Sequence, residues 1–416
     1  MIGSRFGYTL LLYALLPRAL LQLLWRARRQ RAYLDHISER FGRYAVATEQ
    51  PLIWVHAVSV GETRSAEPLI AGLQRKYPRH RILLTHMTPT GRETGTTLFN
   101  QRVLRCYLPY DFPFAVERFL DHFKPACGLL LETEIWPNLI HACRARSIPV
   151  YLVNARLSEK SFRQYRRFGA FAAASLNELA GIAAQSKADA DRLKALGATA
   201  VDVTGNLKFD IAPDAELVAQ GDAWRAAWDR SRPVLLLAST REGEETLLLQ
   251  ALQELDIPRL LTVIVPRHPQ RFDEVAALLE RHAMPFQRRS AGRPIAAQTR
   301  VVLGDSMGEM YAYYAACDVA IIGGSLLPFG SQNLIEACAV GRPVIIGPHT
   351  YNFAEATQLA IDAGAAVRVE DARGAITAAR ELLPDPARAQ RMALAGLDFA
   401  RSHQGATDKI LRLLKL

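Results

Sequence analysis

The sequence predicts an α/β fold of two similar domains, with one apolar helix ahead of them. Three observations predict it. The chain has 416 residues, enough for two or three domains. Apolar runs of strand length alternate with helical patterns, and this alternation starts again after a polar stretch near residue 214. Half of the residues are hydrophobic and 22% are charged, which argues against wholesale disorder and against a multi-span membrane protein.

The amino-terminal segment predicts a membrane anchor. Residues 6–25 read FGYTLLLYALLPRALLQLLW, about the twenty residues needed to cross a hydrocarbon core, and a cluster of arginines follows at 26–31. By the positive-inside rule the rest of the chain then lies in the cytoplasm. Pro17, Arg18 and Gln22 argue against a clean span, so an interfacial helix and a buried amphipathic helix stay open. A cleaved signal peptide fits poorly, because the basic cluster comes after the apolar stretch.

The first α/β domain is predicted at residues 32–212, after an anchor and basic flank at 1–31. Its strand-length runs are 52–55, 81–85, 128–132, 150–154, 181–185 and 201–205. Helical patterns such as 63–76, 114–123 and 187–196 separate them. Strands that alternate with helices form parallel sheets, because a parallel connection needs a crossover.

The second α/β domain is predicted at residues 213–384 and begins with a polar helical stretch at 214–229. Its predicted strands are 234–238, 260–265, 301–303, 319–322, 343–346 and 365–367. Residues 385–416 are predicted to form a carboxyl-terminal helical segment. Open α/β sheets bind ligands at the carboxyl ends of their strands, so two such domains predict a central cleft.

Charge and cysteine content narrow the class of protein. Lysine and arginine total 51 against 41 acidic residues, a net charge of +10 that suits nucleic acid, an anionic membrane or a phosphorylated substrate. The cysteines number five, lie far apart and form no Cys-x-x-Cys pair. They are therefore expected to be reduced core residues rather than disulfides or zinc ligands, which indicates a reducing compartment.

The segment IWVHAVSVGETRSA contains the first candidate site. A strand ends in small residues that include Ser59 and Gly61, and Glu62 follows at the start of a helix. A carboxylate at the carboxyl end of a strand could accept a proton from an attacking hydroxyl. The same glutamate could simply complement the helix dipole, and Ser59 could cap the helix. The exposed backbone N–H groups of this turn could also bind an anion.

A second acidic cluster follows the strand at 128–132. Glu132 and Glu134 stand beside Trp136, just before Pro137. Two carboxylates next to a tryptophan suit substrate contact, and local capping of the helix after Pro137 is the alternative.

Three loops of the second domain are candidates for a phosphate or nucleotide site. Pro266-Arg267-His268-Pro269 ends a strand, and an arginine in such a stiff turn can bind phosphate with its forked guanidinium. Residues 304–310 and the glycine-rich segment from Gly323 offer backbone donors. Glu336, near the start of the next helix, could accept from two ribose hydroxyls. A basic surface turn is the alternative for Arg267.

Taken together, these motifs resemble a known family. The motifs that carry this resemblance occur in order over nearly the whole chain. They are VHAVSVGE, LETEIWPN, NARLSEKS, TGNLKFD, VPRHPQRF, DSMGEM, GGSL, the GSQN segment with Glu336, and GPHTYNF. They are similar to the 3-deoxy-D-manno-octulosonic acid (Kdo) transferases of lipid A biosynthesis. The resemblance implies two Rossmann-like domains with a central cleft, the GT-B glycosyltransferase fold, preceded by the membrane-anchor helix.

The resemblance also implies an activity. It is the inverting transfer of Kdo from CMP-Kdo to lipid IVA, at the cytoplasmic side of the bacterial inner membrane. The first domain would bind the acceptor and the second the donor. The glycine loop and Glu336 alone would also permit another GT-B enzyme that uses a UDP-sugar, either a transferase or a 2-epimerase.

Site residues carry over from the resemblance motif by motif. Glu62 matches the proton acceptor. The CMP contacts match Pro266, Arg267, Met307, Gly308, Glu309, Asn333, Leu334, Ile335 and Glu336. Further possible substrate contacts are Ser59, Gly61, Glu132, Glu134, Arg156, Lys208, Gly324 and Ser325.

Cofactor and partner expectations follow. No metal is expected, because fixed positive groups would replace the divalent ion that other transferases hold through Asp-x-Asp. A basic cluster in the first domain could bind the phosphates of lipid IVA or, with the arginines at 26–31, anionic inner-membrane lipids. It consists of Lys160, Arg163, Arg166 and Arg167, and ordinary solvated helix charge explains it equally well. No nucleic-acid recognition motif is present, so no nucleic acid is expected. The chain departs from the family pattern at Gln332 and Arg241, where histidine is usual.

Overall fold

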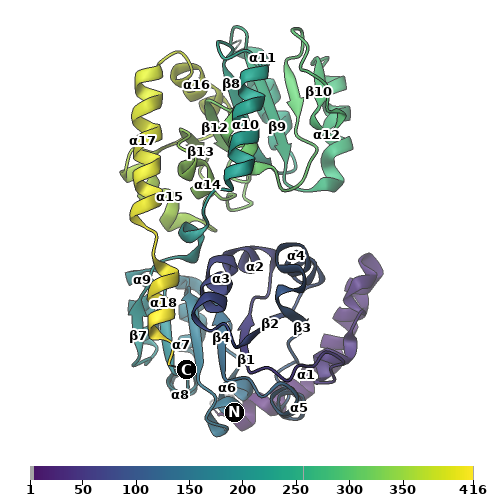
Figure 1. Ribbon diagram of the computed structural model, residues 1–416, viewed down its shortest axis with the longest axis vertical. Helices are drawn as coiled ribbons and strands as arrows, with labels where there is room; N and C mark the ends of the chain where they lie inside the picture. Colours follow the sequence, from purple (N-terminus) through teal and green to yellow (C-terminus); the bar gives the residue numbers. More distant parts are fainter. Residues whose placement is uncertain (1–3, 256, 416) are drawn as a thin grey trace. The chain divides into compact units, whose positions relative to one another are not determined.

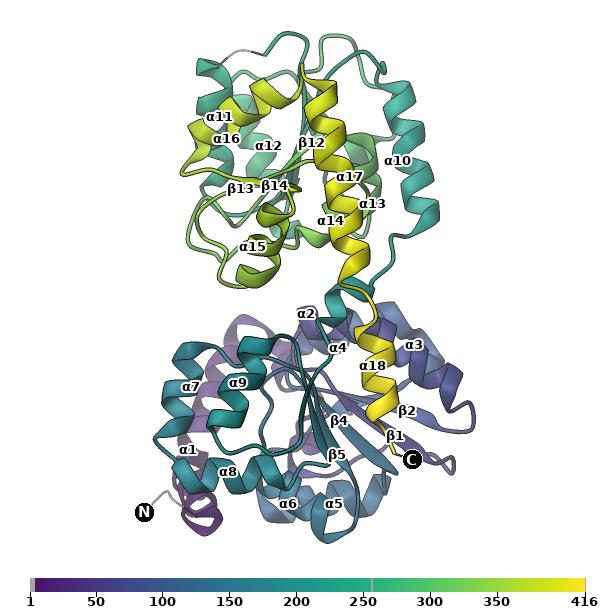
Figure 2. The ribbon, with the colours of Figure 1, turned by 90° about the vertical axis from the view of Figure 1, so that its left-hand side faces the viewer.

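The computed structural model describes residues 4–255 and 257–415, so Met1 to Gly3 of the predicted anchor segment and Leu416 lie outside the described residues. The chain forms two compact units (Figures 1 and 2). Unit 1 comprises Met1–Ile211 together with His403–Leu416, and unit 2 comprises Ala212–Ser402. The chain therefore returns to unit 1 for its last residues.

Unit 1 is built on a seven-stranded parallel sheet in the order β3-β2-β1-β4-β5-β6-β7. The strands are β1 (Leu52–His56), β2 (Arg81–His86), β3 (Leu104–Tyr107), β4 (Cys127–Leu131), β5 (Val150–Ala155), β6 (Gly181–Ala184) and β7 (Val201–Val203). The α-helices are α1 (Arg5–Arg29), α2 (Val60–Ser65), α3 (Glu67–Lys76), α4 (Pro89–Phe99), α5 (Pro113–Phe123), α6 (Pro137–Ala145), α7 (Glu159–Arg166), α8 (Gly169–Asn177), α9 (Lys187–Ala195) and α18 (Ala406–Leu413). Short 3-10 helices are η1 (Arg31–Tyr33), η2 (Ile37–Phe41), η3 (Asn100–Arg102) and η4 (Leu207–Asp210).

Unit 2 repeats the plan with a seven-stranded parallel sheet in the order β10-β11-β9-β8-β12-β13-β14. Its strands are β8 (Val234–Thr240), β9 (Leu261–Pro266), β10 (Phe286–Arg288), β11 (Val301–Leu303), β12 (Val319–Ile322), β13 (Val344–Ile346) and β14 (Ala366–Arg368). Its helices are α10 (Ala215–Ala227), α11 (Glu244–Glu254), α12 (Phe272–Arg281), α13 (Met310–Ala316), α14 (Ile335–Ala339), α15 (Ala354–Asp362), α16 (Ala372–Leu382) and α17 (Pro386–Ser402), with 3-10 helices η5 (Pro269–Arg271) and η6 (Arg289–Ala291).

The central strands of the first sheet, β1 and β4, are buried at every position, which explains their nearly continuous apolar sequences. Leu52 and Trp54 of β1 pack into one core, whereas Ile53 and Val55 pack into the core on the opposite face. Alternate side chains of a strand point to opposite faces, so a strand covered on both sides needs a continuous apolar run. The cysteines are unpaired and buried, as the sequence predicted.

The structure corrects several predicted elements. Strands β3 and β10 were not predicted. The helix predicted at 63–76 is two helices, because α2 ends at Ser65 and α3 begins at Glu67 with a proline in its first turn. The carboxyl-terminal segment is also divided: α17 belongs to unit 2, whereas α18 packs against α3 in unit 1.

Candidate active site

In each sheet, predicted site residues follow the two strands at which the strand order reverses. The chain builds the first sheet outward from β1 on one side and from β4 on the other, and Glu62 follows β1 while Glu132 follows β4. In unit 2 the corresponding neighbours are β8 and β12, which lead to Arg241 and Gly323. Ligands of open α/β sheets bind at this point, beyond the carboxyl ends of the strands.

Glu62 lies in the first turn of α2 and is held by its own turn. The Ser59 hydroxyl donates to Glu62 Oε1 at 2.7 Å and the backbone N–H of Val58 donates to Oε2 at 2.8 Å. Ser59 also caps the helix, since its oxygen accepts from the Glu62 N–H. The capping and the proton-acceptor interpretations are therefore compatible: the cap fixes the carboxylate at the carboxyl end of β1.

Burial is the main reason why the pKa of Glu62 rises to about 7. The nearby Glu132 carboxylate adds to this rise by repulsion, while the bonds from Ser59 and Val58 favour the charged form and oppose it. Burial also raises the pKa of Glu134, whose carboxylate accepts from Trp136 Nε1 at 2.8 Å. A carboxylate with a pKa near neutral can hold and release a proton at physiological pH.

Two cations face these carboxylates. Burial lowers the pKa of Lys208, and attraction to Glu132 and Glu62 opposes that change, while the Arg156 charge adds to it. Lys208 is placed by η4, whose Leu207 N–H donates to Asn154 Oδ1 at the end of β5. The structure thus groups Glu62, Glu132, Glu134, Arg156 and Lys208, all predicted as catalytic or substrate contacts.

In unit 2 the arginine that is predicted to bind phosphate is oriented by the side chain of Gln332. Arg267, which directly follows β9, donates from Nε to Gln332 Oε1 at 3.1 Å. The Arg241 guanidinium lies 4.4 Å from the centre of the Phe329 ring. Gln332 and Arg241 therefore both make contacts at the carboxyl edge of this sheet.

Glu244 organises the glycine-rich loop, and it is not among the predicted site residues. Its carboxylate accepts from the backbone N–H groups of Arg241, Gly324 and Leu326. Gly324 itself has a φ of +68°, a conformation that favours glycine. A detectable signal was present: Glu244, like Glu62, is a glutamate in the first helical turn after the first strand of its domain.

The other predicted contacts, both to the donor and to substrate, take different positions. Ser325 is fully buried, and its hydroxyl bonds Ile322 O and Gly347 N inside the fold. Leu334 and Ile335 are buried as well. Pro266 closes β9, Asn333 Nδ2 donates to Glu336 Oε1 at 3.1 Å, and Gly61, Met307 and Gly308 are exposed.

Glu309 depends on residues outside the predicted set. Its Oε1 accepts from Gln220 of α10 at 3.3 Å and from Arg289 at 3.0 Å, and Oε2 accepts from Ser306. Trp224 of α10 stacks beneath the Arg289 guanidinium, 4.4 Å from ring centre to carbon. The polar pattern of this helix gave no sign of such a role.

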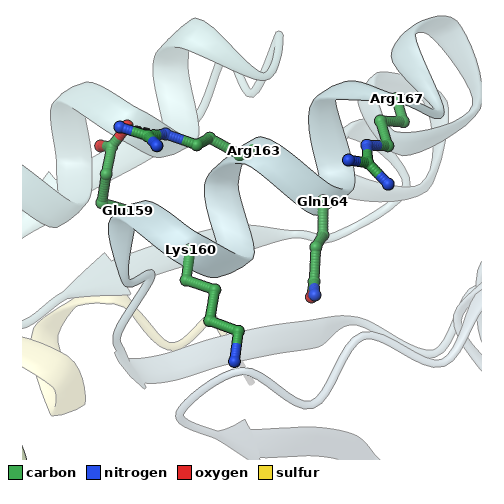
Figure 3. Close-up of a pocket in the computed structure, with 5 residues that line it drawn as sticks. All are labelled: Glu159, Lys160, Arg163, Gln164 and Arg167. Atoms are coloured by element: carbon green, nitrogen blue, oxygen red, sulfur yellow. Dashed lines mark hydrogen bonds and ion pairs between the residues drawn. The ribbon is translucent and has the colours of Figure 1, made fainter.

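A pocket on the surface of α7 is lined by Lys160, Arg163 and Arg167 of the predicted basic cluster, and Arg166 is not among its lining residues. Figure 3 shows Lys160 and Gln164 pointing to the same side of the helix, while Arg163 turns toward Glu159. Arg163 and Glu159 form an exposed ion pair at 3.0 Å, and Arg167 completes the lining. Such a lining of exposed cations suits a phosphate group.

Comparison with known proteins identifies the family. A family model described as 3-deoxy-D-manno-octulosonic-acid transferase (kdotransferase) matches residues 35–211, and one described as glycosyl transferases group 1 matches residues 244–397. The 3-deoxy-D-manno-octulosonic acid transferase of Bordetella pertussis is 48% identical over 99% of both chains. The transferase of that name from Haemophilus influenzae is 37% identical over 99% of this chain and 98% of its own.

A solved structure with little sequence identity supports the fold. The UDP-GlcNAc 2-epimerase of Neisseria meningitidis covers 87% of this chain and 99% of its own, with a TM-score of 0.59 and 16% identity. This likeness confirms the predicted two-domain, GT-B-like class and says nothing of the substrate. The two transferases, by contrast, are similar in sequence over their full length, so the chain belongs to the Kdo transferase family of glycosyltransferases.

Proposed function

We propose that the protein transfers Kdo from CMP-Kdo to lipid IVA with inversion at the anomeric carbon. The observation that carries this proposal is Glu62: a buried carboxylate with a pKa of about 7, at the carboxyl end of β1, in a chain of this family. The motifs that resemble the family's acceptor and donor sites supply the rest.

The proposed base is Glu62. Its carboxylate takes the proton of the acceptor 6′-hydroxyl as that oxygen bonds to the anomeric carbon of Kdo. The bond from this carbon to the phosphate oxygen breaks, and CMP leaves with the electron pair. A base with a pKa near the working pH combines a useful deprotonated fraction with enough basicity. Ser59 and Val58 keep its two oxygens fixed during the transfer.

Donor binding is proposed for unit 2. Arg267, fixed by Gln332, would bind the phosphate of CMP and stabilise the charge that develops as CMP leaves. The loops from Met307 to Glu309 and from Asn333 to Glu336 would hold the nucleoside. We propose that these fixed charges and dipoles make a divalent ion unnecessary.

Acceptor binding and location are proposed for unit 1. Lys160, Arg163 and Arg167 of the α7 pocket would bind a phosphate of lipid IVA. The helix α1 is long and apolar enough to serve as an anchor to the inner membrane, with the catalytic units in the cytoplasm. Anionic lipids would add to the attraction through the basic residues after α1.

Mass spectrometry of the lipid product tests the proposal. The full-length protein in detergent is incubated with CMP-Kdo and lipid IVA, and the lipid is expected to gain the mass of one or more Kdo residues while CMP is released. The same protein is offered UDP-sugars in parallel. Unchanged lipid IVA together with turnover of a UDP-sugar would replace the proposal by the alternative GT-B activity.

A further inference from the structure

Both ends of α1 are attached to the rest of unit 1. Near its start, Tyr8 Oη donates to Asp111 Oδ2 at 3.0 Å and Thr9 Oγ1 donates to Asn138 Oδ1 at 3.0 Å. After its end the chain contacts α1 again through η1 and reaches η2, where Glu39 and Arg40 are buried in the unit. Figures 1 and 2 show α1 in purple beside this unit.

The attachment at the start of α1 belongs to a buried polar network. Asp111 is 2% exposed, and its carboxylate also accepts from the N–H groups of Asn138 and Leu139 at the beginning of α6. Asn138 Nδ2 donates to the Asp111 carbonyl at 2.7 Å. A helix that crossed the bilayer would carry Tyr8 to the opposite side from Asp111. The Tyr8 and Thr9 hydrogen bonds could then not form.

The two faces of α1 differ in exposure. Partly or fully buried positions recur every three or four residues, which marks one side of a helix. They include Tyr8, Leu12, Leu16, Leu20, Leu23 and Ala27, and the neighbouring Gly7 and Thr9 are partly buried as well. The other side is apolar and open: Phe6 is 80% exposed, Leu10 61%, Leu21 68%, Leu24 53% and Trp25 52%.

We propose that α1 lies in the membrane interface, with the exposed face from Phe6 to Trp25 in the lipid, and that it does not cross the bilayer. This inference rests on the proposed membrane location. Interfacial helices bury one apolar face at the boundary of headgroups and acyl chains, and basic residues at their edges contact anionic headgroups.

Arg18 fits this placement. In a crossing helix its charge would lie in the middle of the hydrocarbon core, which is costly. In an interfacial helix the long side chain reaches the headgroups while its stem stays on apolar surface. Arg18 is exposed in the structure, as this arrangement requires.

Labelling of Ser4→Cys tests the topology in the full-length protein. The native cysteines are buried, so the background should be low. A membrane-impermeant maleimide is added to spheroplasts before and after permeabilisation. We expect labelling of the membrane-bound protein only after permeabilisation, as for the control Leu394→Cys, a residue of unit 2 that is 54% exposed. Labelling of intact spheroplasts at Ser4→Cys alone would overturn the proposal.

A second measurement does not depend on correct folding of the Ser4→Cys variant. A green fluorescent protein fused ahead of Met1 should fluoresce in the membrane fraction, because the start of the chain then stays in the cytoplasm. A membrane-bound fusion without fluorescence would contradict the interfacial placement. Recovery in the soluble fraction, as monomer or dimer, would instead overturn the membrane location. Neither the labelling nor the fluorescence depends on turnover. A protein that does not transfer Kdo can therefore be distinguished from one whose α1 crosses the bilayer.

Discussion

Glu62 combines a structural and a proposed chemical role in one helical turn. If it is the base, Glu62→Gln should lower kcat by about 10²-fold to 10⁴-fold, because the amide cannot accept the proton. CMP-Kdo binding, measured by calorimetry, should change little, since the proposed donor contacts lie in unit 2. Glu67→Gln, in the first turn of α3, is the matched control. Near-normal turnover of the Glu62 variant would remove this residue from the base role.

The acidic neighbour of Glu62 predicts a pH effect. Glu62 must be deprotonated to act, so kcat/KM should rise with pH through a midpoint of about 7. Glu132→Gln removes a repulsive charge, which lowers the pKa of Glu62 and moves this midpoint to lower pH. Burial is the larger cause and remains, so the shift should be partial. The remote variant Glu381→Gln should leave the midpoint unchanged; an equal midpoint in all three proteins would contradict the coupling.

Single residues show how far sequence reasoning reaches. The position of Glu62 at the carboxyl end of a strand followed from an apolar run, small residues and a helical pattern. The sequence could not predict that Gln332 is the partner of Arg267, because the two residues are 65 positions apart and only the folded loop brings them together. The buried hydroxyl of Ser325 was equally hidden, since a serine after two glycines looks the same whether it faces a ligand or the core.

At the scale of elements, the sequence predicted the strands that are buried at every position, such as β1, β4 and β9. At the sheet edges it predicted β7 and β14 but missed β3 and β10. β3 is only partly buried in its first half, and β10 consists of Phe286, Gln287 and Arg288, none of them fully buried. Both lie at sheet edges, where a strand is covered on fewer sides and needs no continuous apolar run.

The packing of α10 gives a prediction at this scale. A Cβ added at Gly221 would lie 2.2 Å from the carbonyl oxygen of Ala312, so Gly221→Ala should force α10 away from α13. We expect a loss of about 1 to 3 kcal/mol in the free energy of unfolding, as for other overpacked sites. Donor affinity should also fall, because Gln220 and Trp224 support Glu309 and Arg289.

The matched control for this helix is Gly374→Ala in α16. Its added Cβ would meet its nearest atom at an ordinary 3.4 Å, so the change should be neutral or slightly stabilising through helix propensity. Urea unfolding and donor titration of both variants check the pair. Equal effects of the two variants would mean that the α10–α13 contact tolerates an extra methyl group.

At the scale of the whole molecule, the chain leaves unit 1 after Ile211 and returns at His403. The points of exit and return are joined within unit 1. Asp210 accepts from the N–H groups of Gly405 and Thr407 at the start of α18, and the rings of Phe209 and His403 stack 5.0 Å apart. The sequence predicts residues 385–416 as one helical segment, because local helical patterns do not reveal which sheet a helix covers. Only the burial of α18 against distant parts of the chain shows that this helix completes the core of unit 1.

Substitutions in the last two helices should therefore destabilise different units: those in α18 should destabilise unit 1 and those in α17 should destabilise unit 2. Ile410 of α18 is fully buried in the core of unit 1, whereas Met392 of α17 is buried in the core of unit 2. Ile410→Ala should cost about 2 to 5 kcal/mol through lost burial and a cavity, and Met392→Ala a similar amount. Hydrogen exchange resolved by peptide separates the two. We expect Ile410→Ala to speed exchange in β1 and β4, more than 270 residues earlier in the chain, and Met392→Ala to speed it in β8 and β12. If Ile410→Ala loosened unit 2 instead, α18 would not be part of the first core, and the return of the chain to unit 1 would be wrong.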